Sequence, residues 1–148
     1  MVVKSFRGVL ADQGQERIHL STNQGKVGYR IVKFEVFPFD PANFTQESLV
    51  QIFKNEIATV PAATNAQTDF SNPDLLAAAL YTSDASGGIY PEDTIIVFDL
   101  EIFNQDIYVT HTDQSAGAKI NYYIELEVIP LTDIGAEYTT LKDLRDNA

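Results

Sequence analysis

The chain has 148 residues, of which 45% are hydrophobic and 21% are charged, and it contains no cysteine. This length is enough for one domain with a sizeable core, and a chain without cysteine has no disulfides, thiolate metal sites or cysteine nucleophiles. The formal net charge is −11, from 21 acidic and 10 basic residues. Such a charge repels phosphate groups and anionic lipids, which argues against binding to nucleic acid or to a membrane.

The first segment, residues 1–15, has no clean apolar period, although Phe6, Val9 and Leu10 are apolar. Two interpretations stay open for it. It is either a loose terminus or edge strand, or an extended arm that lays Phe6 and Leu10 on a neighbouring subunit. The remainder, residues 16–148, contains no linker and no internal repeat and is expected to form a single domain.

Three strands are expected in the next part of the chain, at Glu16–Leu20, Lys26–Val36 and Leu49–Lys54. In the second of these the apolar positions shift by one residue near Ile31–Val32, which predicts a β-bulge. Proline cannot donate to a β-ladder, so Pro38 is expected to end that strand.

The middle of the chain is less regular. The residues at 71–74, Ser-Asn-Pro-Asp, carry helix-start signals and predict a helical turn near 72–75. Residues 76–81 stay open, because three alanines favour a helix while the apolar run is also typical of a buried strand. Residues 82–93, rich in Gly, Ser and Asp, are expected to form a flexible loop.

A strand is expected at Thr94–Phe103, followed by a turn at 104–106 and a hairpin partner at Ile107–Thr112. In Thr94–Phe103 the even-numbered apolar residues are expected to face inward, namely Ile96, Phe98, Leu100 and Ile102.

The clearest strand is Lys119–Pro130, where apolar and polar residues alternate. Its even-numbered residues, Ile120 to Val128, predict a buried face, and its odd-numbered residues predict a wet one. In the tail, apolar residues recur at helical spacing, so a short C-terminal helix is expected. Seven or eight short strands in all predict an all-β fold, either a single antiparallel jelly-roll-like β-sandwich or a small barrel.

Few residues point to chemistry. The two histidines, His19 and His111, have no second ligand at metal-binding spacing, so they are expected to be surface or hydrogen-bonded residues rather than a zinc pair. Acidic residues alternate on two strands, as Glu125 with Glu127 and Asp99 with Glu101. Such pairs suit a solvated sheet face; the alternatives are a glycoside hydrolase or, together with Asp113, a calcium site.

No nucleophile elbow or glycine-rich phosphate loop occurs in the sequence. We therefore expect no enzyme activity, no cofactor and no metal site. Tyr123 is the one aromatic residue on the wet face of Lys119–Pro130. It is present either because aromatic residues favour β-strands, or because it is an interface anchor or a platform for stacking sugars.

Several stretches of the chain resemble small proteins from marine tailed bacteriophages, and they cover nearly its whole length. They are SFRGVL (Ser5 to Leu10), ERIHLSTNQGKVGY (Glu16 to Tyr29), DFS (Asp69 to Ser71), LLAAA (Leu75 to Ala79), EIFNQDIYVTHTD (Glu101 to Asp113), NYYIELE (Asn121 to Glu127) and LKDLR (Leu141 to Arg145).

This resemblance implies a virion structural protein without catalytic residues. Small acidic β-domains of phage particles commonly bind the capsid as cement or decoration, often as trimers, and others lie in the tail or fibre. The expected partners are therefore the major capsid protein and copies of this chain, and the expected location is the capsid surface after synthesis in the host cytoplasm. The partner-binding candidates are Phe6, Arg7, Val9, Leu10 and Tyr123. The alternative is a receptor- or glycan-binding module of a tail, fibre or head appendage.

Overall fold

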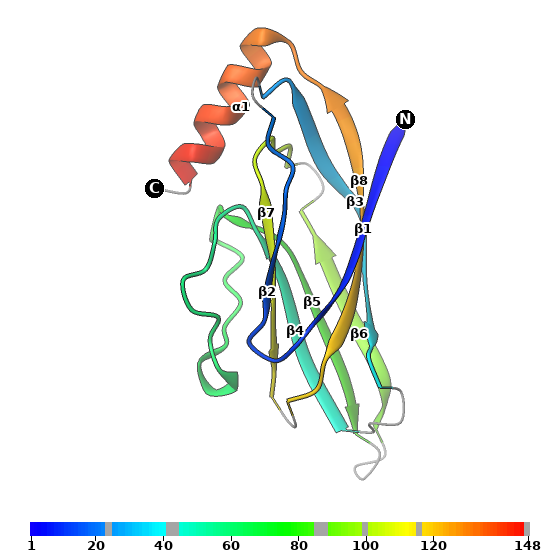
Figure 1. Ribbon diagram of the computed structural model, residues 1–148. Coiled ribbons are helices and arrows are strands. Elements are labelled where there is room, and N and C mark those ends of the chain that lie inside the picture. The colour runs from blue at the N-terminus through cyan, green and yellow to red at the C-terminus, as the bar shows by residue number, and fades with distance from the viewer. Residues whose placement is uncertain (23–24, 41–44, 85–88, 99–100, 115–116, 147–148) are drawn as a thin grey trace.

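A computed structural model describes residues 1–22, 25–40, 45–84, 89–98, 101–114 and 117–146. It shows a sandwich of two antiparallel sheets with a helix at one end (Figure 1). The elements in chain order are β1 (Val2–Leu10), β2 (Gln15–Ile18), β3 (Val27–Pro38), β4 (Thr45–Phe53), the 3-10 helix η1 (Ala63–Asn65), β5 (Leu75–Asp84), β6 (Ile89–Val97), β7 (Ile107–Asp113), β8 (Ile120–Pro130) and α1 (Asp133–Asp146).

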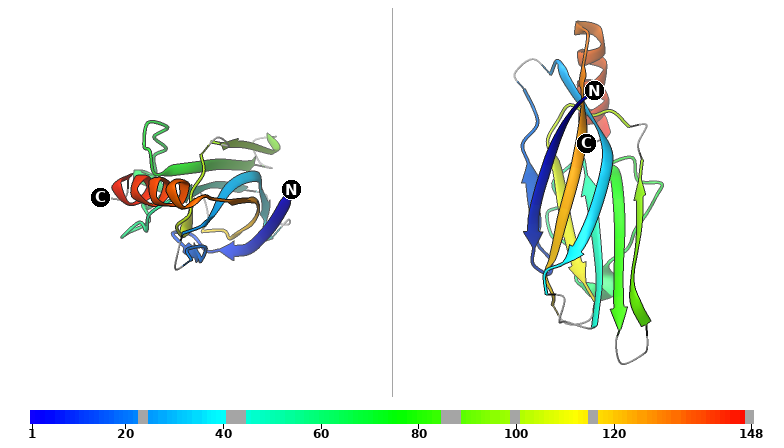
Figure 2. Two further views of the ribbon diagram at one scale, coloured as in Figure 1. Left: turned by 90° about the horizontal axis from the view of Figure 1, so that it is seen from above. Right: turned by 90° about the vertical axis from the view of Figure 1, so that its right-hand side faces the viewer.

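The strand order matches that of a jelly roll except at one strand, β6. One sheet has the order β1-β8-β3 and the other β2-β7-β4-β5-β6, and the two sheets lie face to face (Figure 2). In a jelly roll β6 would follow β3 in the first sheet, whereas here it is hydrogen-bonded to β5 at the edge of the second sheet. The jelly-roll-like β-sandwich expected from the sequence is confirmed.

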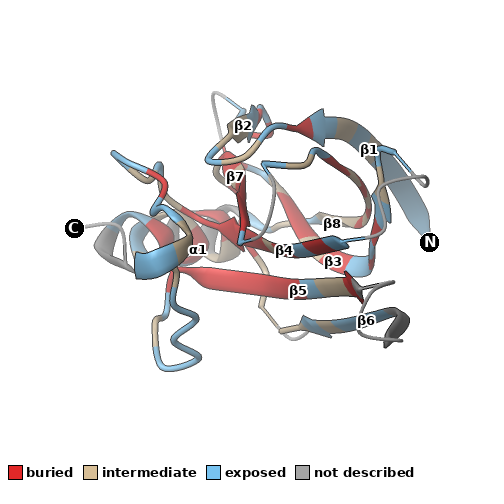
Figure 3. Cartoon of the chain, turned by 90° about the horizontal axis from the view of Figure 1, so that it is seen from below, coloured by how far each residue is buried: buried red, intermediate tan, exposed pale blue. Residues whose placement is uncertain are grey.

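The core lies between the inner faces of the two sheets (Figure 3). From β8, alternate residues such as Ile124 and Leu126 are fully buried, and Val50 and Ile52 of β4 face them from the second sheet. This is the burial that the alternation in β8 predicts, because successive side chains leave opposite sides of the pleat.

The predicted bulge in β3 is confirmed. The register of β3 against β8 shifts between Ile31 and Lys33, so Val32 is the extra residue and its side chain is exposed. The shift lets Ile31 and Phe34 both face the core although their numbers differ in parity.

The helical turn predicted near 72–75 is a single tight turn instead. The amide of Leu75 donates to the carbonyl of Asn72 over 3.2 Å, and the amide of Asp74 donates to the Asn72 side chain over 3.0 Å. Asn and Pro favour such turns as strongly as helix starts. Strand β5 begins at once, because its alanines Ala77 and Ala79 pack in the core, where burial overrides helix propensity.

Two predictions around β6 are wrong. Residues 82–93 are not a loop as a whole, because β5 extends to Asp84 and β6 begins at Ile89 and pairs with it. The inward residues of β6 are Ile95 and Val97, which pack against the core, whereas Ile96 is 38% exposed. Consecutive isoleucines leave the parity of a strand undetermined, and only the pairing with β5 decides it. Leu100 lies outside the described residues.

The predicted hairpin between Thr94–Phe103 and Ile107–Thr112 is also wrong. Strand β7 pairs with β2 and β4, and β6 pairs with β5. The chain between β6 and β7 crosses to the other sheet, where Phe103 forms an isolated bridge with Tyr29 of β3.

At the chain ends, the structure shows an edge strand and a helix. Strand β1 pairs with β8 along its whole length and lies at the edge of its sheet. The predicted C-terminal helix is confirmed as α1, and Thr132 caps it by accepting the amide of Gly135 over 3.0 Å. Among the described residues, no helix combines the length and apolar character needed to cross a membrane.

A buried carboxylate fastens β2 to the start of β7. The backbone amides of Leu20 and Ser21 each donate to Oδ1 of Asp106 over 2.8 Å, and the Arg17 guanidinium donates to Oδ2. Burial alone would raise the pKa of Asp106, but these hydrogen bonds outweigh it and hold the pKa well below its usual range.

We therefore expect Asp106→Asn to lower the free energy of unfolding by about 1–3 kcal/mol, because it removes the charge that two buried amides and Arg17 bind. Urea denaturation at pH 7 measures this change. Glu92→Gln, an isosteric loss of charge at an exposed position of β6, is the control. Equal stability of Asp106→Asn and the wild type would contradict the assigned role.

Candidate functional site

We call the side of the β1-β8-β3 sheet that points away from the core the outer face. Across its three strands, residues lie in matched rows, because β8 pairs with β1 on one side and with β3 on the other. The rows from one end of the sheet to the other are Val9–Asn121–Phe37, Arg7–Tyr123–Glu35, Ser5–Glu125–Lys33 and Val3–Glu127–Arg30.

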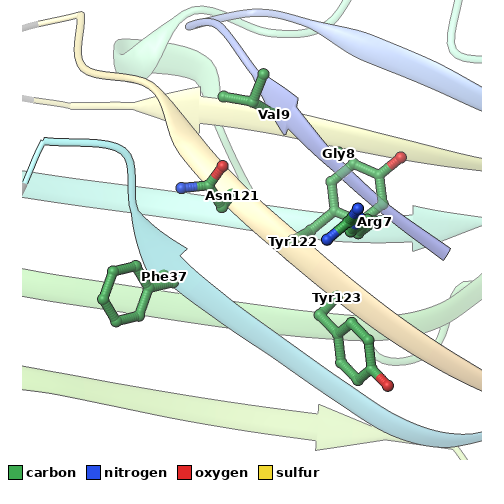
Figure 4. A pocket seen from close by; sticks show the side chains of 7 residues that line it. All are labelled: Arg7, Gly8, Val9, Phe37, Asn121, Tyr122 and Tyr123. Atoms are coloured by element: carbon green, nitrogen blue, oxygen red, sulfur yellow. The ribbon is translucent and has the colours of Figure 1, made fainter. Parts of the chain in front are cut away.

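A shallow hollow of about 530 Å³ lies at one end of the outer face, lined by residues of all three strands. Figure 4 shows Arg7 and Val9 on β1, Asn121 and Tyr123 on β8, and Phe37 at the end of β3 around it. Phe37 is 63% exposed and Val9 is 44% exposed. The hollow thus combines exposed apolar groups with a guanidinium and an amide.

The charges of the outer face balance each other, although the chain is strongly acidic. Three bases stand against three acids, namely Arg7, Arg30 and Lys33 against Glu35, Glu125 and Glu127. The net charge of −11 therefore arises elsewhere in the chain. A partner approaching the outer face consequently meets little of the repulsion that the rest of the protein exerts on an acidic surface.

Short-range interactions hold the polar groups of this face in place. Arg30 binds Glu127 over 2.5 Å, and the Tyr123 hydroxyl donates to Glu125 over 2.8 Å. This hydrogen bond raises the pKa of Tyr123, since it favours the protonated phenol. The Lys33 ammonium lies 5.9 Å from the centre of the Tyr123 ring, a cation–π distance.

The structure brings together three of the five residues singled out as partner-binding candidates. Arg7, Val9 and Tyr123 all line the hollow. Phe6 and Leu10 do not, because they lie on the opposite parity of β1 and face the core. Phe37 was not among the candidates predicted from the sequence, and its signal there is an aromatic residue at a solvent-facing position next to the strand-ending Pro38.

Gly8 fits this place because Tyr122 occupies the space beside it. A Cβ atom on Gly8 would lie 2.8 Å from the Tyr122 hydroxyl and 2.8 Å from a carboxylate oxygen of Glu16. Burial, with Glu16 beside the hydroxyl, raises the pKa of Tyr122. Tyr122 therefore fills the sandwich beneath the hollow and stays a neutral phenol.

The two histidines serve separate structural roles. His19 is exposed beside Asp106, whereas His111 is buried, with Nδ1 donating to the carbonyl of Ala11 over 3.0 Å and Nε2 accepting from the Ser48 hydroxyl over 3.0 Å. His111 thus ties the end of β1 to the second sheet. In the described part of the chain, no group of three or more His, Asp or Glu residues is placed to hold a metal ion.

The alternating acids do not face each other across a cavity. Glu125 and Glu127 bind Tyr123 and Arg30 as described above, and Glu101 contacts Lys54 and Lys142. Asp113 is buried, where the amides of Glu47 and Ala118 donate to it. Asp99 lies outside the described residues.

The chain matches no protein-family model and no curated protein sequence.

Burial of the neutral imidazole lowers the pKa of His111, so the unfolded chain binds a proton more readily than the folded one. The stability that His111 contributes is therefore fully present above the pKa of the unfolded imidazole, about 6.5. This contribution is lost as the pH falls from there toward the lower pKa of the folded state. We expect urea denaturation to show lower stability at pH 5 than at pH 7, and His111→Gln to reduce this difference. An unchanged difference in the variant would contradict the assignment.

Proposed function

We propose that the protein is a virion structural protein, a cement or decoration subunit that binds the major capsid protein and stabilises a phage head. Two things support this proposal: the resemblance to small phage proteins, and an outer face in which exposed apolar groups, an arginine and a tyrosine surround a hollow. The observation that carries it is the gathering of Arg7, Val9 and Tyr123 with Phe37 in that hollow.

The chemistry of the hollow suits a protein partner. Val9 and Phe37 offer apolar anchors, and the planar guanidinium of Arg7 can bind a carboxylate of the partner with two parallel hydrogen bonds. Aromatic residues and arginine dominate the binding energy of many interfaces. The balanced charges allow close approach to a capsid surface that would otherwise repel an acidic protein.

The outer face also changes how residues 1–15 would contribute. An arm that leaves the domain would expose Phe6 and Leu10, which here pack in its own core. We therefore assign the capsid contact to the outward residues Arg7 and Val9, with β1 kept in its sheet. Truncation of β1 is a poor test for this reason, since it would open the core.

Helix α1 suits the second expected partner, a further copy of this chain. Among the α1 side chains that the structure describes, the exposed ones are large and apolar, with Tyr138 69% and Leu141 68% exposed, while Ala136 and Thr139 are buried beneath the helix. An apolar stripe that faces outward is typical of an interface. The trimer inferred from the phage resemblance remains a prediction for which this stripe is the candidate contact.

Binding of the purified protein to phage heads that lack it tests the proposal. We expect Val9→Asp to weaken binding by about tenfold or more, because it places a charge in the desolvated centre of the contact. Ile96→Asp is a matched control, since Ile96 is as exposed as Val9 but lies on the edge strand of the other sheet.

Failure of the wild-type protein to bind heads would overturn the capsid function. Equal losses in both variants would overturn the outer face as the contact while leaving the function standing. Circular dichroism of each variant establishes that it is folded.

A second candidate, a glycan- or receptor-binding module, is supported by one feature of the hollow. Asn121 lies between Phe37 and Val9 in the register of the sheet, and Tyr123 lines the same hollow. Aromatic rings beside an amide are the groups that stack on a sugar and bind its hydroxyls.

A glycan array tests this second function. We expect wild-type binding to be lost in Tyr123→Ala and kept in Tyr138→Ala, which removes the same type of side chain from an exposed position of α1. The absence of binding to any glycan on the array would contradict this candidate and would leave the capsid function as the remaining one.

A further inference from the structure

A lysine and two acids from three distant parts of the chain meet at the base of α1. Lys54 follows β4, Glu101 precedes β7 and Asp143 lies in α1. The Lys54 Nζ atom lies 2.5 Å from Oε1 of Glu101 and 3.6 Å from Oδ1 of Asp143. Lys54 and Asp143 are both almost completely buried, and the Glu101 side chain is 33% exposed.

We propose that Lys54 and Asp143 condense to an intramolecular isopeptide bond, with Glu101 as the group that transfers the proton. A buried amine next to a buried carboxyl, with a second carboxylate touching the amine, is the arrangement that this condensation requires. The inference does not depend on the proposed function, since the bond would fasten α1 to the sandwich in any role.

The two oxygens of Asp143 have different surroundings, and each would therefore have a different role in the condensation. Oδ2 accepts the backbone amide of Asn104 over 3.0 Å, whereas Oδ1 faces Lys54 and has no hydrogen-bond partner among the described residues. Oδ2 is thus the carbonyl oxygen, whose developing negative charge the amide stabilises. Oδ1 is the hydroxyl oxygen that leaves as water.

The protonation states suit the reaction. Burial raises the pKa of Asp143, which favours the neutral acid that an amine can attack. Burial would also raise the pKa of Glu101, but hydrogen bonds from Lys54 and Lys142 outweigh it and lower the pKa. Glu101 therefore remains a carboxylate, and the reaction begins from the pair in which one proton has passed from Lys54 to Asp143.

The reaction balances without any further reactant. The Lys54 nitrogen attacks Cγ of Asp143, and Glu101 accepts a proton from that nitrogen. The Cγ–Oδ1 bond then breaks, and Glu101 returns the proton to Oδ1, which departs as water. An amide joins the two side chains, and the fold supplies the proximity that makes condensation possible, since effective molarities of well-placed groups reach about 10⁵ M or more.

Mass spectrometry of the denatured, intact protein tests the proposal. We expect the wild-type chain to be one water molecule lighter than its sequence requires, and protease digestion to yield a branched peptide that joins residues 54 and 143. Lys54→Met and Asp143→Ala each lack a reacting group and should have the full sequence mass whether or not they fold. Glu101→Gln should have the full sequence mass while circular dichroism shows that it is folded.

The matched control is Lys33→Met. Lys33 pairs with Glu35 and Glu125 on the outer face, away from these three residues. We expect this variant to lose water like the wild type. A wild-type protein of full sequence mass after prolonged incubation at neutral pH would overturn the proposal, and so would a water loss that persists in Lys54→Met.

Discussion

The rest of the structure depends on the two-sided pairing of β8. This strand is hydrogen-bonded to β1 along one edge and to β3 along the other, while its inner side chains, from Ile120 to Leu126, are buried against the second sheet. A register slip of one residue would move every one of these side chains to solvent. The same alternation sets the outer face, because each residue that β8 buries leaves its neighbour pointing outward beside β1 and β3.

Polar groups, rather than apolar ones, connect the two sheets and the helix at the ends of the sandwich. His111 links the end of β1 to β4 and β7, and Asp106 binds the amides that follow β2. Asn104 donates from its side chain to the hydroxyl of Thr140 in α1 over 2.6 Å. Buried polar groups cost free energy unless every one is paired, so such links specify one arrangement of the connections.

Helix α1 buries polar side chains and exposes apolar ones. Its inward side carries Asp143 and the small residues Ala136 and Thr139, whereas Tyr138 and Leu141 point to solvent. A helix that buries polar groups and exposes apolar ones is held by directed bonds and leaves its apolar surface available. The outer face and α1 are thus two separate surfaces with exposed apolar side chains, one of balanced charge and one apolar. The proposed cement function would use one for the capsid and the other for copies of this chain.

The sequence by itself determined the all-β class, the bulge in β3, the buried face of β8 and the terminal helix, because each follows from local periodicity. It also singled out Arg7, Val9 and Tyr123. Only the tertiary structure decided which strands pair, which side of β6 is buried, and that Phe37 joins those three residues in one hollow. Sheet pairing and the meeting of distant side chains depend on contacts between parts of the chain far apart in sequence, and no local pattern encodes them.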